Sequence, residues 1–216
     1  MKTRSVYSVI KRDVSEEEII NQKLFNVFVF GLPRSGTSMM THICELLGVK
    51  MFHTTEKKKR EYKHLGAEYH PNATGFYEVT EDLLKHYFEI VGTPYSGCKM
   101  IIPVRRERFD LVKLVPAKVI MMWREPEEIR QSQNAFYAKN ADLAYIRTAL
   151  VQEKLKLKEN NIDHIIVQYR DVIKNPHAEI LKIKDFILSE RDIDEAVSFV
   201  NPNAYRFDKD KIVEGV

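Results

Sequence analysis

The stretch from Leu24 to Val49 constrains the fold of this chain more than any other part of the sequence. The apolar run Val27 to Phe30 precedes the segment Gly31 to Gly36, and an apolar-periodic stretch begins at Thr37. This order predicts a buried strand, a tight loop and an amphipathic helix. Glycines at both ends of the loop let the backbone curl until several N–H groups point at one centre, and the helix adds the positive end of its dipole. The sequence therefore predicts an anion-binding loop.

Phosphate is the natural anion for such a loop, which we call the anion loop (residues 31–38). Its spacing matches the phosphate-binding pattern G-x-x-x-x-G-K-[ST] with one departure, because Thr37 stands where the pattern has lysine. That lysine reaches the β- and γ-phosphates of a nucleoside triphosphate, so its loss argues against ATP or GTP. The positive charge lies instead within the loop, at Arg34. An ordinary strand-to-helix turn is the alternative, and the two glycines, the strand and the hydroxyls of Thr37 and Ser38 argue against it.

The anion loop resembles the 5′-phosphosulfate loop of the sulfotransferase family. The donor in that family is 3′-phosphoadenosine-5′-phosphosulfate (PAPS), the product is 3′-phosphoadenosine-5′-phosphate (PAP), and a basic residue inside the loop serves the sulfonate end. Arg34 has the position of that basic residue. The resemblance implies that the following residues bind the nucleotide: Pro33, Arg34, Ser35, Gly36, Thr37 and Ser38.

A second candidate site follows the apolar stretch Lys118 to Trp123, which predicts a central parallel strand. Arg124 comes directly after it, Pro126 opens the next helix, and Ser132 lies eight residues after the arginine. An arginine at the carboxyl end of a strand can bind an anion with two hydrogen bonds, and a serine can donate its hydroxyl. An ATPase would carry a magnesium-binding aspartate there. The pattern R-x-P-x-x-x-x-x-S resembles the 3′-phosphate-binding motif of sulfotransferases.

Two carboxylates crowd the start of the helix that carries Ser132. We expect Glu127 and Glu128 to point to solvent and to interact favourably with the helix dipole. An ion pair between Arg124 and a surface glutamate is the alternative to an anion site at the arginine.

The resemblance covers the chain from about Phe25 to Ile187. Its third part is the stretch Ile165 to Ile187, which resembles the family's later strand, its Y-E-D-L turn and the helix after the turn. In this chain the turn is Tyr169-Arg170-Asp171-Val172. This part concerns the fold more than the ligand.

Two features depart from the cytosolic members of the family. Those enzymes carry a lysine and, two residues later, a histidine base, whereas this chain has Lys99 but Ile101. They also close a glycine-rich basic loop on the nucleotide near the C terminus. Here the stretch Tyr205 to Lys209 is the counterpart, with Arg206 as the candidate nucleotide contact.

Sulfuryl transfer resembles phosphoryl transfer, in which positioning and charge stabilisation do most of the work. The leaving phosphate is stable, so we expect no metal, and Arg34 or Lys99 can place a cation at the bridging oxygen. A base must take the proton of the acceptor hydroxyl. Glu78 ends the string Gly75-Phe76-Tyr77-Glu78, which resembles one common in bacterial sulfotransferase-like proteins, and His70 is the other candidate. The alternatives are a helix-terminal acid at Glu78 and a solvated histidine at position 70.

Beyond the anion loop, apolar strand segments alternate with amphipathic helix segments. The alternation predicts an α/β, doubly wound domain with a central parallel sheet, whose ligands bind at the carboxyl ends of the strands. We expect one domain over residues 1–216, with a core of about 24–200. Residues 50–77 contain no clear core strand and are predicted to form a lid or substrate segment. Two capping boxes predict further short helices: Ser15 with Glu18, and Asp192 with Glu195.

Composition places the chain among globular proteins. Of its 216 residues 44% are hydrophobic and 30% charged, and the net charge of +3 is too small to argue for nucleic-acid binding. No stretch has the apolar length of a membrane helix, and the basic N terminus lacks the apolar core of a signal peptide. Cys44 and Cys98 lack disulfide-framework spacing and are predicted to be buried free thiols, which indicates a reducing compartment such as the cytoplasm.

Together these features predict a PAPS-dependent sulfotransferase that acts on a hydroxyl of a small-molecule or carbohydrate acceptor, without a metal and without nucleic acid. They make no prediction about oligomeric state. A nucleotide or small-molecule kinase of the P-loop class would be favoured if ATP and magnesium bind despite Thr37. A non-catalytic nucleotide-binding module would be favoured if no base lies near the sulfonate.

Overall fold

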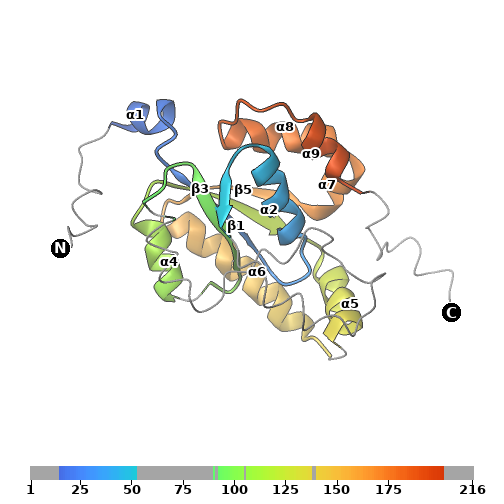
Figure 1. The fold of residues 1–216 in the computed structure, drawn as a ribbon. Helices are drawn as coiled ribbons and strands as arrows, with labels where there is room; N and C mark the ends of the chain where they lie inside the picture. The colour runs from blue at the N-terminus through green and yellow to red at the C-terminus, as the bar shows by residue number, and fades with distance from the viewer. Residues whose placement is uncertain (1–14, 53–89, 91, 105, 138–139, 202–216) are drawn as a thin grey trace, which may run out of the picture.

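The computed structural model describes residues 15–52, 90, 92–104, 106–137 and 140–201. Its centre is a five-stranded sheet in the order β2-β3-β1-β4-β5, and every neighbouring pair is parallel (Figure 1). The predicted parallel α/β sheet is therefore confirmed. The strands are β1 (Asn26–Gly31), β2 (Lys50–Phe52), β3 (Ser96–Ile101), β4 (Ala117–Trp123) and β5 (Asp163–Gln168).

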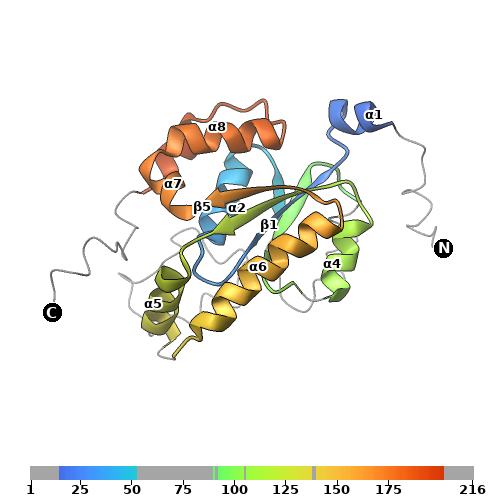
Figure 2. The same cartoon turned by 180° about the vertical axis from the view of Figure 1, so that it is seen from behind.

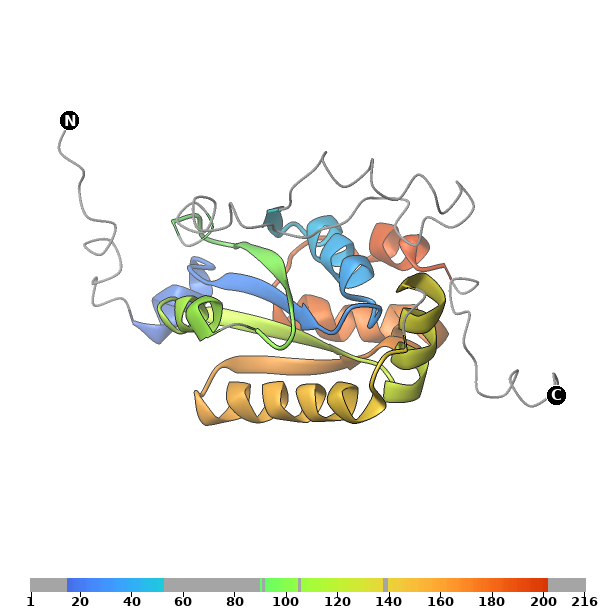
Figure 3. The ribbon, with the colours of Figure 1, turned by 90° about the horizontal axis from the view of Figure 1, so that it is seen from below.

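Helices cover both faces of the sheet, as the doubly wound pattern predicts. Figure 2 shows α4 and α6 in front of the strands with α2 behind them, and Figure 3 shows the strands between α2 and α6. The described helices are α1 (Glu16–Asn21), α2 (Thr37–Leu46), α4 (Arg106–Lys113), α5 (Pro126–Tyr137), α6 (Leu143–Glu159), α7 (Tyr169–Lys174), α8 (Pro176–Phe186) and α9 (Asp194–Phe199).

The alternation of side chains along β1 divides the apolar core into two layers. Val27 and Val29 pack with residues of α2, α7, α8 and α9, whereas Phe28 and Phe30 pack with residues of α4, α5 and α6. All four side chains are fully buried. A central strand that is apolar on both faces is what a sheet covered on both sides requires, and it fixes the direction in which β1 delivers the anion loop.

Three local predictions were wrong. Residues 50–77 were expected to lack a core strand, but Lys50–Phe52 forms β2 beside β3, and the rest of that stretch lies outside the described residues. The expected turn at Tyr169 is the first turn of α7. Asp192 forms no capping box, because its Oδ1 accepts from the N–H of Asp194, only two residues on, and Ile193 is the N-cap of α9. The Ser15 cap is confirmed, since its Oγ accepts from the N–H of Glu18 over 3.1 Å.

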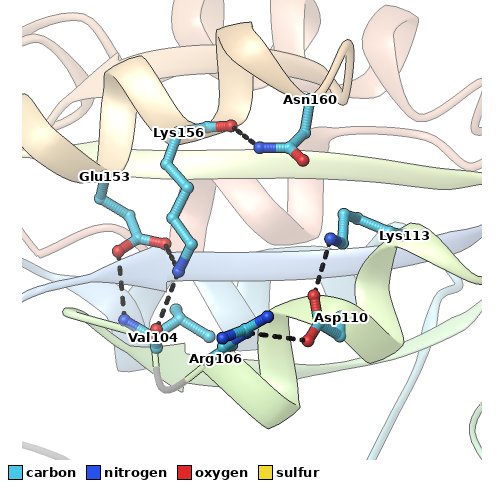
Figure 4. A network of polar contacts seen from close by, with 7 residues as sticks. All are labelled: Val104, Arg106, Asp110, Lys113, Glu153, Lys156 and Asn160. Carbon is cyan, nitrogen blue, oxygen red and sulfur yellow. Dashed lines mark hydrogen bonds and ion pairs between the residues drawn. The ribbon is translucent and has the colours of Figure 1, made fainter.

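The chain leaving β3 is held by two side chains of α6 (Figure 4). Glu153 Oε2 accepts from the N–H of Val104 over 3.1 Å, and Lys156 Nζ donates to the carbonyl of Val104 over 2.9 Å. Glu153 is 2% exposed, and burial raises the pKa of its carboxyl group despite the nearby Lys156 amine and the Val104 hydrogen bond. The two contacts fix the path of the chain directly after the strand that carries Lys99.

The two cysteines are free and buried, as predicted. In the part of the chain that the structure describes, no helix combines the length and the apolarity that a membrane crossing needs. The same residues contain no group of three histidine, cysteine or carboxylate side chains arranged to hold a metal ion.

Candidate functional site

The anion loop joins β1 to α2, which confirms the predicted strand, loop and helix. Both of its glycines are required by close approach. A Cβ on Gly31 would lie 2.5 Å from Ser35 Oγ and 2.5 Å from Thr37 Cγ2. Gly36 is the N-cap of α2 with a φ of 93°, and a Cβ there would lie 2.4 Å from Cδ2 of Tyr169. The loop therefore curls tightly over the start of α2, where the helix dipole favours an anion.

Side chains that follow β4 hold two carbonyl groups of the anion loop. Arg124 Nη1 donates to the carbonyl of Arg34 over 3.0 Å, and Gln133 Nε2 donates to the carbonyl of Pro33 over 3.0 Å. Arg34 itself has a φ of 74°, an uncommon conformation for a residue other than glycine. These contacts stabilise the curled loop from outside.

The two predicted anion motifs meet in the structure. Arg34 Nε donates to Ser132 Oγ over 3.2 Å, and Ser132 is 3% exposed on α5. The contact forms because β1 and β4 are neighbouring parallel strands, so the loop after β1 and the helix after β4 share one edge of the sheet. From the sequence, the two motifs were interpreted as separate sites. In the structure they lie side by side.

Lys99 brings a second cation to the start of α2. It lies on β3 opposite Val29 of β1, and its Nζ donates to Ser38 Oγ over 3.1 Å. Lys99 is 4% exposed. A positive charge from the neighbouring strand thus reaches the helix start at which Thr37 replaces the lysine of the phosphate-binding pattern.

The expectation that Glu128 points to solvent was wrong. Glu128 is 1% exposed, and its Oε2 accepts from Arg124 Nε over 3.0 Å. Because α5 begins at Pro126, a side chain in its first turn can reach back to the end of β4, where Arg124 stands. Glu127 is half-buried and instead accepts from Arg130 Nε over 3.1 Å. The alternative of an Arg124–glutamate pair is therefore observed, with a buried glutamate in place of a surface one.

Tyr169 is a site residue that the sequence analysis missed. Its ring packs against Gly36, and the guanidinium carbon of Arg124 lies 4.6 Å from the ring centroid. A cation over an aromatic face is attracted by the ring quadrupole. The available signal was position, because Tyr169 directly follows β5, the strand beside β4, at the ligand-binding edge of the sheet.

The described site thus gathers three cationic side chains and three serine hydroxyls around the start of α2. This set suits a ligand that carries more than one anionic group. Three candidates from the sequence lie outside the described residues and remain predictions: Glu78, His70 and Arg206. The members of the set are Arg34, Lys99, Arg124, Ser35, Ser38 and Ser132.

The comparison with solved structures found matches, and the comparisons with family models and curated proteins found none. Among solved structures, the sulfotransferase domain of an olefin synthase from Synechococcus PCC 7002 aligns with a TM-score of 0.50 at 19% identity, over 85% of this chain and 78% of that chain.

Two further solved structures align less closely. Retinol dehydratase in complex with androsterone and inactive cofactor PAP has a TM-score of 0.47 at 14% identity, over 84% of this chain and 65% of that chain. A gluconokinase from Sinorhizobium meliloti 1021 has a TM-score of 0.41 at 12% identity, over 90% of this chain and 99% of that chain. The alignment with the olefin synthase domain shows that the chain has a sulfotransferase-like α/β fold of the P-loop type.

Proposed function

We propose that this protein is a sulfotransferase that binds PAPS and transfers its sulfonate to a hydroxyl of a small-molecule or carbohydrate acceptor. The contact between Arg34 and Ser132 carries the proposal. It joins a loop suited to the 5′-phosphosulfate to a motif suited to the 3′-phosphate. A nucleotide phosphorylated at both the 5′ and the 3′ position needs both the loop and the motif.

The anion loop fits such a ligand. Ser35 is fully buried, and its Oγ has no hydrogen-bond partner among the described residues. A buried hydroxyl without a partner is costly, and an anion in the loop would supply an acceptor. The hydroxyl of Ser38, already within reach of Lys99, stands at the same helix start. These features support nucleotide binding through the 5′-phosphosulfate.

Bound PAPS would supply the sulfonate and a stable phosphate leaving group. Arg34 and Lys99 stabilise the negative charge that develops on the bridging oxygen as the sulfur–oxygen bond to the phosphate breaks. Arg124 and Ser132 hold the 3′-phosphate and so fix the position of the nucleotide. A base in the chain, for which Glu78 and His70 are the candidates, takes the proton of the acceptor hydroxyl while the new oxygen–sulfur bond forms.

Two residues favour this proposal over a P-loop kinase. Thr37 replaces the lysine that would contact the phosphates of ATP, and Arg124 stands at a strand end where an ATPase carries a magnesium-binding aspartate. An arginine there suits a second anion. We propose the cytoplasm as the compartment, which the buried free thiols of Cys44 and Cys98 support.

Calorimetry with PAP and with ATP–magnesium tests the proposed function. We expect PAP to bind, and to bind equally well in EDTA, because the proposed contacts with its phosphates come from side chains and backbone of the chain. We expect ATP–magnesium to bind at least about tenfold more weakly. Tighter binding of ATP–magnesium than of PAP, or loss of PAP binding in EDTA, would favour a kinase function over a sulfotransferase function.

A further inference from the structure

A buried carboxylate lies directly beside the arginine to which we assign the 3′-phosphate. Glu128 is 1% exposed, Arg124 is 7% exposed, and the Nε–Oε2 distance is 3.0 Å. A carboxylate beside an anion site repels the anion, and the repulsion is stronger where water is excluded. Some gain must therefore offset the cost of Glu128 at this position.

One candidate gain is charge compensation. An arginine buried without a counter-charge destabilises a fold, and Glu128 supplies that counter-charge. This purely structural role predicts that loss of the carboxylate lowers the stability of the protein. It predicts no change in the preference of the site for one nucleotide over another.

The geometry indicates a second gain, in orientation. Arg124 is held from three sides: its Nε donates to Glu128, its Nη1 donates to the Arg34 carbonyl, and its guanidinium lies over the ring of Tyr169. A guanidinium group whose orientation is fixed before the ligand arrives loses little conformational freedom when it binds a phosphate. The same arginine also holds the anion loop through the Arg34 carbonyl, so its orientation bears on both ends of the nucleotide.

We propose that Glu128 is a positioning residue that orients Arg124 and thereby sets the selectivity of the site for nucleotides with a 3′-phosphate. The inference rests on the proposed function, because it takes the 3′-phosphate as the ligand of Arg124. Glu128 acts through the arginine, on the side of the guanidinium that carries Nε. Its loss lets the guanidinium turn, so a nucleotide with the 3′-phosphate loses more binding energy than a nucleotide without it.

The chain offers a matched control on the same helical turn. Glu127 is adjacent to Glu128, carries the same charge and is also engaged with an arginine, but its partner is Arg130. Glu127→Gln therefore changes the charge of α5 by the same amount without touching the pair of Arg124 and Glu128. The loss of one unit of net charge is common to both variants, so a difference between them reports on the position of Glu128 beside Arg124.

The test is calorimetric titration of PAP and AMP into the full chain and into Glu128→Gln, Glu128→Asp and Glu127→Gln. We expect the unmutated protein to prefer PAP over AMP by at least about tenfold. Glu128→Gln lowers that ratio by about fivefold or more, whereas Glu127→Gln keeps it within about twofold. Glu128→Asp retains the carboxylate and keeps the ratio within about threefold of wild type. An unchanged ratio in Glu128→Gln would overturn the positioning role.

A double variant tests whether Glu128 acts through the arginine. In Arg124→Ala the PAP:AMP ratio falls towards one, and adding Glu128→Gln causes no further fall. If the double variant lowers the PAP:AMP ratio by a further factor of about three or more, Glu128 affects nucleotide selectivity by a contact other than the one with Arg124. The double variant removes both buried charges, so it also tests the ratio without an uncompensated carboxylate in the fold.

Arginine side-chain NMR of the unmutated protein gives a measurement that does not depend on the folding of a variant. The Nε–H of Arg124 is expected to exchange slowly with water and to shift more with PAP than with AMP. Rapid exchange, or equal shifts with both nucleotides, would contradict the positioning role. If wild type itself binds PAP and AMP equally, the proposed function fails first, which separates that failure from a failure of Glu128 alone.

Discussion

Arg34 Nε and Ser132 Oγ lie 3.2 Å apart although 98 residues separate them in the sequence. The contact is a consequence of topology: β1 and β4 are adjacent and parallel, so the segments that follow them meet at the same edge of the sheet. In Figure 1 the loop after β1 and helix α5 lie at the same end of the sheet. One sheet edge therefore gathers the groups assigned to both ends of the nucleotide.

Ser132→Ala removes the hydroxyl that Arg34 contacts and that we assign to the 3′-phosphate. We expect PAP affinity to fall by about fivefold to tenfold, because one hydrogen bond with a charged partner is lost. Calorimetry measures the change, and Gln131→Ala, at the neighbouring position of α5, is the control. Wild-type PAP affinity in Ser132→Ala would remove Ser132 from the site.

Gly36→Ala tests the close approach of Tyr169 to the anion loop. Gly36 and Gly48 have nearly the same positive φ, 93° and 92°, so alanine at either position costs about 1–2 kcal/mol of backbone strain. Only at Gly36 does a Cβ meet a ring carbon at 2.4 Å; at Gly48 the nearest atom is 3.3 Å away on the Arg191 side chain. Chemical denaturation should find Gly36→Ala less stable than Gly48→Ala by about 1–3 kcal/mol. Equal losses would mean that the ring moves aside freely.

Glu153→Gln tests the buried carboxylate that holds Val104. Burial raises the pKa of Glu153 above its ordinary value of 4.5, so the folded protein binds this proton more tightly than the unfolded chain does. The contribution of Glu153 to stability is therefore largest at low pH and falls as the pH rises from 4.5 through the raised pKa. Glutamine does not titrate, so its contribution to stability does not fall as the pH rises.

Denaturation of wild type and Glu153→Gln between about pH 4 and pH 8 checks the sign of this effect. The stability of Glu153→Gln relative to wild type should increase with pH across that window. Glu159→Gln, at an exposed position of the same helix, is the control for the loss of one carboxylate from α6. A stability difference that stays constant with pH would mean that Glu153 titrates alike in the folded and unfolded protein.

Glu78→Gln and His70→Ala distinguish the two candidate bases, both of which are sequence predictions. A glutamate at a helix start is kept ionised by the dipole, as a base must be. Glu78→Gln should keep PAP affinity and lose about 10²–10⁴-fold in turnover, whereas His70→Ala should change turnover little. Steady-state kinetics with PAPS and an accepted alcohol measures both. The reverse ranking would exchange the two roles, and full turnover in both variants would exclude them.

Much of the fold could be predicted because its signals are local. The apolar run before Gly31, the loop spacing and the periodic stretch after Thr37 specify β1, the loop and α2 without reference to the rest of the chain. The stretch Val119 to Trp123 is apolar on both faces, which is a local mark of a central strand. Pro126 likewise specifies the start of α5, because the fixed φ of proline suits the first position of a helix.

The relations that the sequence did not reveal are those between elements. The burial of Glu128 depends on where the end of β4 points relative to α5, and a carboxylate in a first helical turn has the same local signal whether it faces solvent or an arginine. The contact of Tyr169 with Gly36 depends on how closely α7 approaches the anion loop. Lys99 was identified by family resemblance, but its contact with Ser38 follows from the register of β3 on β1.

Titration of PAP and of AMP into the unmutated protein, in EDTA, measures directly how much the 3′-phosphate contributes to binding. The two nucleotides differ only in the 3′-phosphate, for which the site offers Arg124 and Ser132. We expect PAP to bind at least about tenfold more tightly than AMP, a difference of about 1.4 kcal/mol that one charge-assisted contact can supply. Equal affinities for PAP and AMP would contradict the assignment of Arg124 and Ser132 to the 3′-phosphate.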